Sequence, residues 1–167
     1  MPHDARTLAE KASRLNERYR HHSATSVLER ALHDPDVGRL ALVSSFGAES
    51  VVLLHLVSVL APTTPVLFID TMMLFPETLA YQQELAAKLT LTDLRIIRAD
   101  AGAIRRDDPD GTLHQFSTDA CCDLRKTLPL ERALQGFGGW ITGRKRFQAS
   151  SRAAIDFFEV DAGRRLK

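Results

Sequence analysis

The chain has 167 residues, of which 44% are hydrophobic and 26% are charged, and its formal net charge is +1. This length suits a single domain over residues 1–167, and the composition is that of an ordinary soluble globular protein. A net charge so close to zero excludes nucleic-acid binding by bulk electrostatics, so any anion site must come from a local cluster of cations.

No targeting or membrane segment is evident. The N-terminal residues are charged throughout and lack the apolar core of an export signal. The longest apolar run, residues 51–61, is interrupted by His55 and Ser58 and is too short to span a bilayer. Two cysteines give no disulfide framework. We therefore expect a cytoplasmic protein with no nucleic-acid or membrane partner, and the sequence leaves its oligomeric state open.

The first third of the chain predicts two helices, a strand and a third helix. The helices are expected over residues 5–19 and 24–34. The short apolar run at residues 40–45 is typical of a buried parallel strand. The following helix, residues 48–60, is apolar almost all round, which predicts a place inside the core.

The middle of the chain predicts two further strands around a helix. The strands are expected at residues 65–70 and 93–100. Between them, Pro76 and Glu77 mark a helix start, because proline fits the first turn and an acid suits the helix dipole there.

The last third begins with a polar stretch, residues 101–118, which we expect to be a mobile loop with a short helical part. A helix carrying both cysteines should run from about Asp119 until Pro129 breaks or restarts it. A fourth strand is expected at residues 139–143, and residues 154–160 are a candidate for a fifth at an edge.

Strands alternating with helices predict an α/β fold: a three-layer, doubly wound, mainly parallel sheet of the Rossmann-like kind. Ligands of such sheets bind beyond the carboxyl ends of the strands, where the strand order reverses. Three segments of interest follow predicted strands, namely residues 44–50, 70–71 and 143–146. Their common position is the main argument from the residues for a nucleotide site.

Each segment carries groups that suit a nucleotide. Residues 44–50, SSFGAES, offer small side chains, hydroxyls and helix N-terminal amides to a phosphate. Asp70, followed by Thr71, could accept a hydrogen bond from an adenine or a ribose, although a capping role is the ordinary alternative. The run at residues 142–152 holds three consecutive cations that could close over an anion. Taken singly, a packing turn and a solvated charged loop explain these segments as well.

Cys121 and Cys122 are adjacent and are the only cysteines in the chain. Neighbours in sequence cannot easily form a disulfide, because its geometry is demanding. Arg125 and Lys126 follow closely, and cations favour the thiolate that soft metals and iron–sulfur clusters require. The ordinary alternative is a pair of buried free cysteines.

Five segments in order, SSFGAES, FIDT, FPETL, ACCDLRKTLPL and ITGRKRFQASSR, together resemble the assimilatory adenylyl-sulfate and phosphoadenylyl-sulfate reductases, members of the PP-loop superfamily of adenine-nucleotide-binding proteins. The likeness covers about residues 25 to 165. The cysteine pair resembles the iron–sulfur form that uses adenosine 5′-phosphosulfate. This implies reduction to sulfite and AMP with thioredoxin or a similar thiol donor, and a [4Fe–4S] cluster with Cys121 and Cys122 as two ligands.

The resemblance also assigns residues to the nucleotide and its phosphosulfate group. They are Ser44, Ser45, Phe46, Gly47, Ala48, Glu49, Ser50, Asp70, Thr71, Lys126, Gly143, Arg144, Arg146 and Gln148.

The sequence departs from the family in two ways. The family's Asp-Thr-Gly motif is here Asp70, Thr71 and Met72. The family also has a Cys-x-x-Cys pair and a catalytic cysteine in a C-terminal tail, and neither occurs in residues 1–167. We therefore expect this chain to be the nucleotide-binding part of a longer protein, with no catalytic residue of its own.

Other functions remain open at this point. One is a phosphoadenylyl-sulfate reductase. Another is a non-catalytic nucleotide-binding module whose cysteines sense a metal or redox state. A third is an ATP-using PP-loop enzyme, which the absence of an acidic pair for magnesium after residues 44–50 weighs against.

Overall fold

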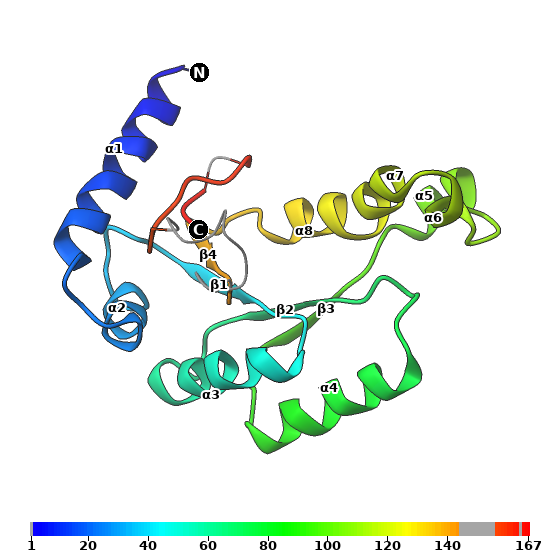
Figure 1. The fold of residues 1–167 in the computed structure, drawn as a ribbon, viewed down its shortest axis with the longest axis horizontal. Coiled ribbons are helices and arrows are strands. Elements are labelled where there is room, and N and C mark those ends of the chain that lie inside the picture. The colour runs from blue at the N-terminus through cyan, green and yellow to red at the C-terminus, as the bar shows by residue number, and fades with distance from the viewer. Residues whose placement is uncertain (1, 144–155, 164) are drawn as a thin grey trace.

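The computed structural model describes residues 2–143, 156–163 and 165–167, in which helices alternate with short strands (Figure 1). The strands are β1 (Leu40–Val43), β2 (Val66–Ile69), β3 (Leu94–Ile97) and β4 (Gly139–Ile141). The helices are α1 (Pro2–Tyr19), α2 (Ala24–Ala31), the 3₁₀ turn η1 (Ala48–Ser50), α3 (Val51–Leu60), α4 (Pro76–Lys88), α5 (Ala101–Asp107), α6 (Leu113–Phe116), α7 (Thr118–Cys122), the π-helical turn η2 (Asp123–Thr127) and α8 (Leu128–Ala133).

The four strands form one parallel sheet in the order β3-β2-β1-β4. The chain moves outward from β1 to β2 and β3, and β4 then pairs on the other side of β1. The strand order therefore reverses between β1 and β4, which is where ligands of such sheets bind. The prediction of a doubly wound parallel sheet is confirmed.

Helices cover both faces of the sheet (Figure 1). Successive strand residues point to opposite faces. On β1, Leu42 packs in a cluster with Leu54 of α3 and Leu85 of α4. The neighbouring Ala41 packs on the other face, with Leu134 at the end of α8. These two clusters make the three layers.

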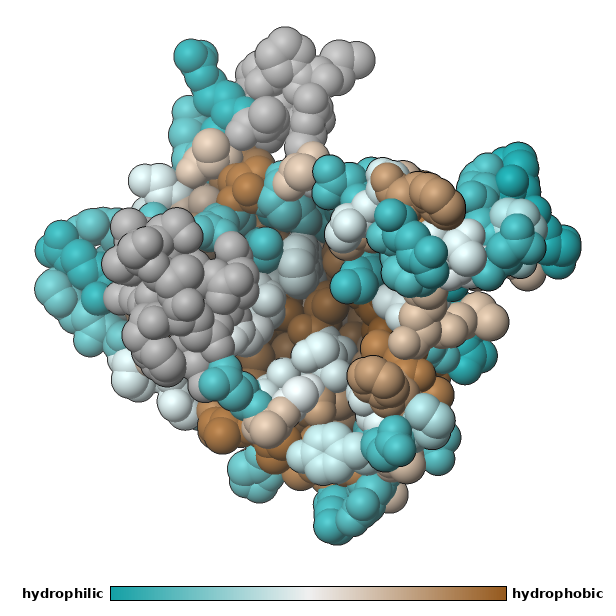
Figure 2. Space-filling model, turned by 45° about the vertical axis from the view of Figure 1, so that its right-hand side comes forward, coloured by the Kyte–Doolittle hydropathy of each residue, from teal (hydrophilic) through white to brown (hydrophobic). Residues whose placement is uncertain are grey.

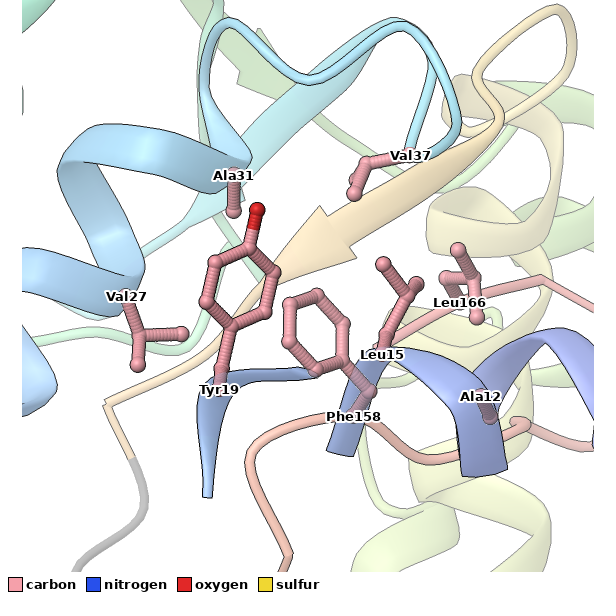
Figure 3. Packing of buried hydrophobic residues seen from close by; sticks show 8 residues of the cluster. All are labelled: Ala12, Leu15, Tyr19, Val27, Ala31, Val37, Phe158 and Leu166. Atoms are coloured by element: carbon pink, nitrogen blue, oxygen red, sulfur yellow. The ribbon is translucent and has the colours of Figure 1, made fainter. Parts of the chain in front are cut away.

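A third cluster lies beside β4, where helices α1 and α2 meet the C-terminal residues. Figure 3 shows the rings of Tyr19 and Phe158 lying against each other in it, and their centroids are 5.7 Å apart. Leu166 packs in the same cluster and forms a parallel bridge with Gly139 at the open edge of β4. The two ends of the chain are thus packed together against the sheet.

The burial of helix α3 differs from the prediction. It was expected inside the core, but only Leu54 and Val57 are buried in it, and the side of α3 that carries Val52 and Val59 faces outward. These two residues are 68% and 66% exposed. An all-apolar helix predicts burial on every side only where other elements surround it, and here the sheet covers one side.

Two predictions in the last third were also wrong. Residues 101–118 are mainly helical, because Asp100 caps α5 by accepting from the Ala103 amide. No regular strand occurs at the described residues 156–160, where Val160 forms a single antiparallel bridge to Leu166.

The cysteine helix continues through Pro129. A proline clashes with the carbonyl four residues earlier and has no amide to donate. The chain accommodates it with the π-helical turn η2, in which the Leu128 amide donates to the Asp123 carbonyl, five residues back. Helix α8 then restarts at Leu128.

None of the helices in the described ranges has the length and the apolar composition needed to cross a membrane.

Candidate functional site

The segments predicted to bind a nucleotide follow three adjacent parallel strands. Residues 44–50 follow β1, residues 70–71 follow β2, and Gly143 follows β4. A Cβ atom on Gly143 would lie 3.5 Å from Leu53 of α3, so the turn after β4 passes close to the helix that follows β1. The structure thus brings these segments to one edge of the sheet, at the reversal of strand order.

The turn after β1 is held by its own side chains. Ser44 is buried, and its Oγ accepts from the Phe46 amide at 3.2 Å. Ser45 Oγ accepts from the Gly47 amide at 3.5 Å. Phe46 has a φ of 57° and packs edge-on against Phe68, with ring centroids 5.4 Å apart. Its ring belongs to the core, so Phe46 can reach a ligand only through its backbone.

The remaining residues of this turn face outward. Gly47, Ala48 and Glu49 are exposed, and Ser50 is half-buried at the start of α3. Two amides of this turn have partners inside it: the Gly47 amide donates to Ser45 Oγ, and the Ser50 amide donates to the Gly47 carbonyl at 2.8 Å. The exposed Ser45 hydroxyl can donate a hydrogen bond to an anion, because accepting from the Gly47 amide leaves its proton available.

The turn after β2 is built around Asp70, which is buried at the end of the strand. Its Oδ1 accepts from the Met72 amide at 2.9 Å, and its Oδ2 accepts from Nε of Arg98 at 2.8 Å. Thr71 Oγ1 accepts from the Met73 amide at 3.3 Å. One carboxylate oxygen of Asp70 thus holds the turn, and the other binds the arginine that follows β3.

The cysteines lie where α7 passes into η2. Cys121 is half-buried and Cys122 is exposed. Lys126 is exposed on η2, whereas Arg125 next to it points inward. Arg125 binds Asp108 through Nη2 at 2.6 Å and the Thr71 carbonyl through Nη1 at 2.8 Å. Its guanidinium is therefore committed to other groups, which corrects its expected role as a cation for the thiols.

Asp108 is held as a carboxylate. The hydrogen bond from Arg125 lowers its pKa below the ordinary value, and the Leu113 amide adds to this effect. Sequence reasoning missed Asp108 and Arg98 entirely. The sequence does contain a signal for Arg98, because this residue directly follows the apolar run of the third strand and so lies at a strand end. The sequence contains no such signal for Asp108, since its partner Arg125 lies 17 residues away.

A largely apolar cavity of about 640 Å³ adjoins the site on the α3 side. Glu49, Leu53 and Gly143 line it near the switch point, and α2 with the C-terminal residues forms the opposite wall. The predicted contacts Arg144, Arg146 and Gln148 lie outside the described residues.

Across the described ranges, no group of three or more His, Cys, Asp or Glu side chains could hold a metal ion. Cys121 and Cys122 are the two cysteines of the chain. A cluster held by four thiolates needs two more ligands, so the residues of this chain do not fit a [4Fe–4S] cluster by themselves.

A three-layer parallel sheet with polar turns gathered at its switch point is the architecture of nucleotide-binding α/β domains. Residues 39–166 match the family described as the phosphoadenosine phosphosulfate reductase domain. The chain therefore belongs to this sulfonucleotide reductase family.

Three relatives show the range of the likeness. An adenosine 5′-phosphosulfate reductase of Mesorhizobium japonicum is 46% identical over 94% of this chain, and one of a Chelativorans species is 42% identical over 90%. The chain spans 62% of the length of each. A crystal structure of a phosphoadenylyl-sulfate reductase from Candida auris, in a phosphate complex, matches with a TM-score of 0.78 at 26% identity, covering 93% of this chain and 75% of that one.

Proposed function

We propose that this chain is the nucleotide-binding part of an adenylyl-sulfate reductase and that residues 1–167 form one domain of it. The adjacent Cys121 and Cys122 carry the proposal, because they lie with Lys126 on the helical segment that Arg125 ties to the turn after β2. The names of the two relatives at 46% and 42% identity support the same substrate. The packing of α1 against Phe158 and Leu166 supports one domain.

The geometry suggests how the ligand is held. The turn after β1 faces the phosphosulfate group, the exposed Ser45 hydroxyl donates to that group, and Lys126 neutralises charge on it. The apolar cavity beside Gly143 offers walls for a planar base. The resemblance adds Arg144, Arg146 and Gln148, which lie outside the described residues, as further contacts of the anion in this proposal.

The reaction of the whole enzyme is a nucleophilic displacement. A cysteine thiolate forms a bond to the sulfur of adenosine 5′-phosphosulfate, the bond from that sulfur to the phosphate oxygen breaks, and AMP leaves. A dithiol such as thioredoxin then attacks the S-sulfocysteine and releases sulfite while it is itself oxidised. The attacking thiolate comes from outside residues 1–167, and in the whole enzyme Cys121 and Cys122 serve as two cluster ligands.

Calorimetry on residues 1–167 tests the substrate. The chain should bind adenosine 5′-phosphosulfate and AMP more tightly than the 3′-phosphorylated nucleotide. Lys126→Ala should weaken AMP binding by about 1–3 kcal/mol, the cost of losing a charged hydrogen bond. Lys88→Ala is the matched control, because Lys88 lies on α4 and pairs with Glu84. A clear preference for the 3′-phosphorylated nucleotide would contradict the proposal.

A further inference from the structure

Arg125 joins two parts of the molecule that lie far apart in the sequence. Its Nε and Nη2 donate to Asp108 Oδ2 at 3.1 and 2.6 Å, and its Nη1 donates to the carbonyl of Thr71 at 2.8 Å. The Asp108 carboxylate also accepts from the Leu113 amide through Oδ1 at 2.9 Å. One guanidinium thus links the turn after β2, the connection from α5 to α6, and the helical segment that carries the cysteines.

This ion pair is removed from water. The side chains of Arg125 and Asp108 are 6% and 1% exposed. Desolvating a charge pair offsets much of its attraction, so such a pair adds little net stability, yet losing one partner leaves a buried charge unmatched. The guanidinium of Arg125 nevertheless fixes the positions of its partners, because its hydrogen-bond donors have a fixed planar geometry and its hydrogen bonds are directional.

The turn that Arg125 contacts needs such a restraint. Met72 has a φ of 61°, in the left-handed region that favours glycine. Asp70 holds the turn through the Met72 amide, and Arg98 holds Asp70 from the exposed side. The bond to the Thr71 carbonyl is the contact that fixes the turn from inside the fold.

Arg125 points inward from within the π-helical turn η2. Arg125 is buried, whereas Cys122 before it and Lys126 after it are exposed. The same turn therefore presents Lys126 at the surface and anchors the segment from beneath.

We propose that Arg125, clamped by Asp108, is a positioning residue: it sets the backbone of the Asp70–Thr71 turn for the nucleotide and holds the cysteine segment in fixed register with it. This inference rests on the proposed function, since it assumes that the turn after β2 contacts the nucleotide.

The test compares two arginine-to-lysine variants of residues 1–167. Arg125→Lys keeps the positive charge but cannot donate to both partners in the same geometry. Arg95→Lys is the matched control, because Arg95 makes a paired bond to Asp93 at 2.8 Å at the amino end of β3, away from the turns. Calorimetry with AMP should give a dissociation constant about ten-fold higher for Arg125→Lys, the loss of one charged hydrogen bond. Arg95→Lys should bind AMP within about two-fold of the unchanged chain, while both variants melt at lower temperature.

A second measurement uses the unchanged chain and does not depend on the folding of a variant. Amide hydrogen exchange with and without AMP should show slower exchange at Met72 and Met73 together with Leu113, whose amide is bonded to Asp108. Protection at residues 72–73 without protection at Leu113 would overturn the coupling. Unchanged AMP affinity in folded Arg125→Lys would overturn the positioning role. If the unchanged chain binds neither AMP nor adenosine 5′-phosphosulfate, the proposed function itself has failed.

Discussion

Arg98 donates from Nε to Oδ2 of Asp70 at 2.8 Å and thereby joins the carboxyl ends of β3 and β2. The two side chains differ sharply in exposure, at 58% for Arg98 and 4% for Asp70. The buried carboxylate depends on this bond, because its other oxygen is used by the Met72 amide. The pair makes β3 part of the support of the candidate site although no predicted ligand contact lies on β3.

Replacing Arg98 by alanine should therefore destabilise the fold through Asp70. The change leaves a buried carboxylate oxygen without its charged donor, which costs about 1–2 kcal/mol of unfolding free energy. Urea denaturation measures it. Arg105→Ala is the control, since Arg105 is exposed on α5 and should change stability by less than about 0.5 kcal/mol. Equal stability of both variants would show that water replaces Arg98 at no cost.

Met72 gives a prediction of increased stability. Its φ of 61° places a side chain in the left-handed region, which costs a residue other than glycine about 1 kcal/mol. Met72→Gly should thus raise the unfolding free energy by up to about 1 kcal/mol. Met73→Gly is matched in composition, but Met73 has no positive φ, so glycine there should lower stability. Thermal melts of the two variants should move in opposite directions.

How far the sequence predicts this fold is clear from particular elements. The apolar runs located the central strands β1 and β2, because a buried parallel strand is apolar on both faces. The apolar composition of α3 wrongly predicted that the helix is buried on all sides. Hydrophobicity alone does not say whether another element covers the side with Val52 and Val59. Residues 101–118 were misjudged because their helices depend on caps and on the distant pair between Asp108 and Arg125.

The candidate site was predicted in part for a similar reason. Its three segments follow from strand ends, which are local features of the sequence. The sequence around Arg125 and Lys126 does not say which of the two turns inward, because Arg125 is held inside by distant partners, Asp108 and the Thr71 carbonyl. Asp70 and Thr71 are held by Arg98 and Arg125, which lie 28 and 54 residues away in the sequence. The periodicity of hydrophobic residues does not indicate contacts between such distant residues.

Acid should weaken the fold through Asp108. Its pKa is lowered in the folded state, chiefly by the hydrogen bond from Arg125, relative to an ordinary value of 3.8. The resulting stabilisation is fully present above that value and is lost as the pH falls through the lower folded pKa. Asp93, whose pKa Arg95 lowers, contributes a loss of the same sign.

The measurement is the unfolding free energy between neutral pH and pH values below about 4, the range in which aspartate titrates. The unchanged chain should lose stability steeply at the acid end. Asp108→Asn should be less stable at neutral pH, because Arg125 loses its buried partner, and should show a shallower acid slope. Parallel slopes for the two proteins would mean that Asp108 has the same pKa folded and unfolded.

The polypeptide of residues 1–167 should release no sulfite from adenosine 5′-phosphosulfate, even where the nucleotide binds. The reaction needs a thiolate that reaches the sulfur atom, and Cys121 and Cys122 are its two thiols. They lie at the end of α7, where we assign them to a cluster, and two thiolates do not complete a [4Fe–4S] site. The protein should accordingly be colourless, or only weakly and unstably coloured after reconstitution with iron and sulfide.

The direct assay is anaerobic incubation with labelled adenosine 5′-phosphosulfate and thioredoxin, with sulfite as the readout and a sample without protein as the control. Sulfite above that control, abolished by Cys121→Ser or by Cys122→Ser, would show that the pair is itself catalytic and that the assigned role is wrong.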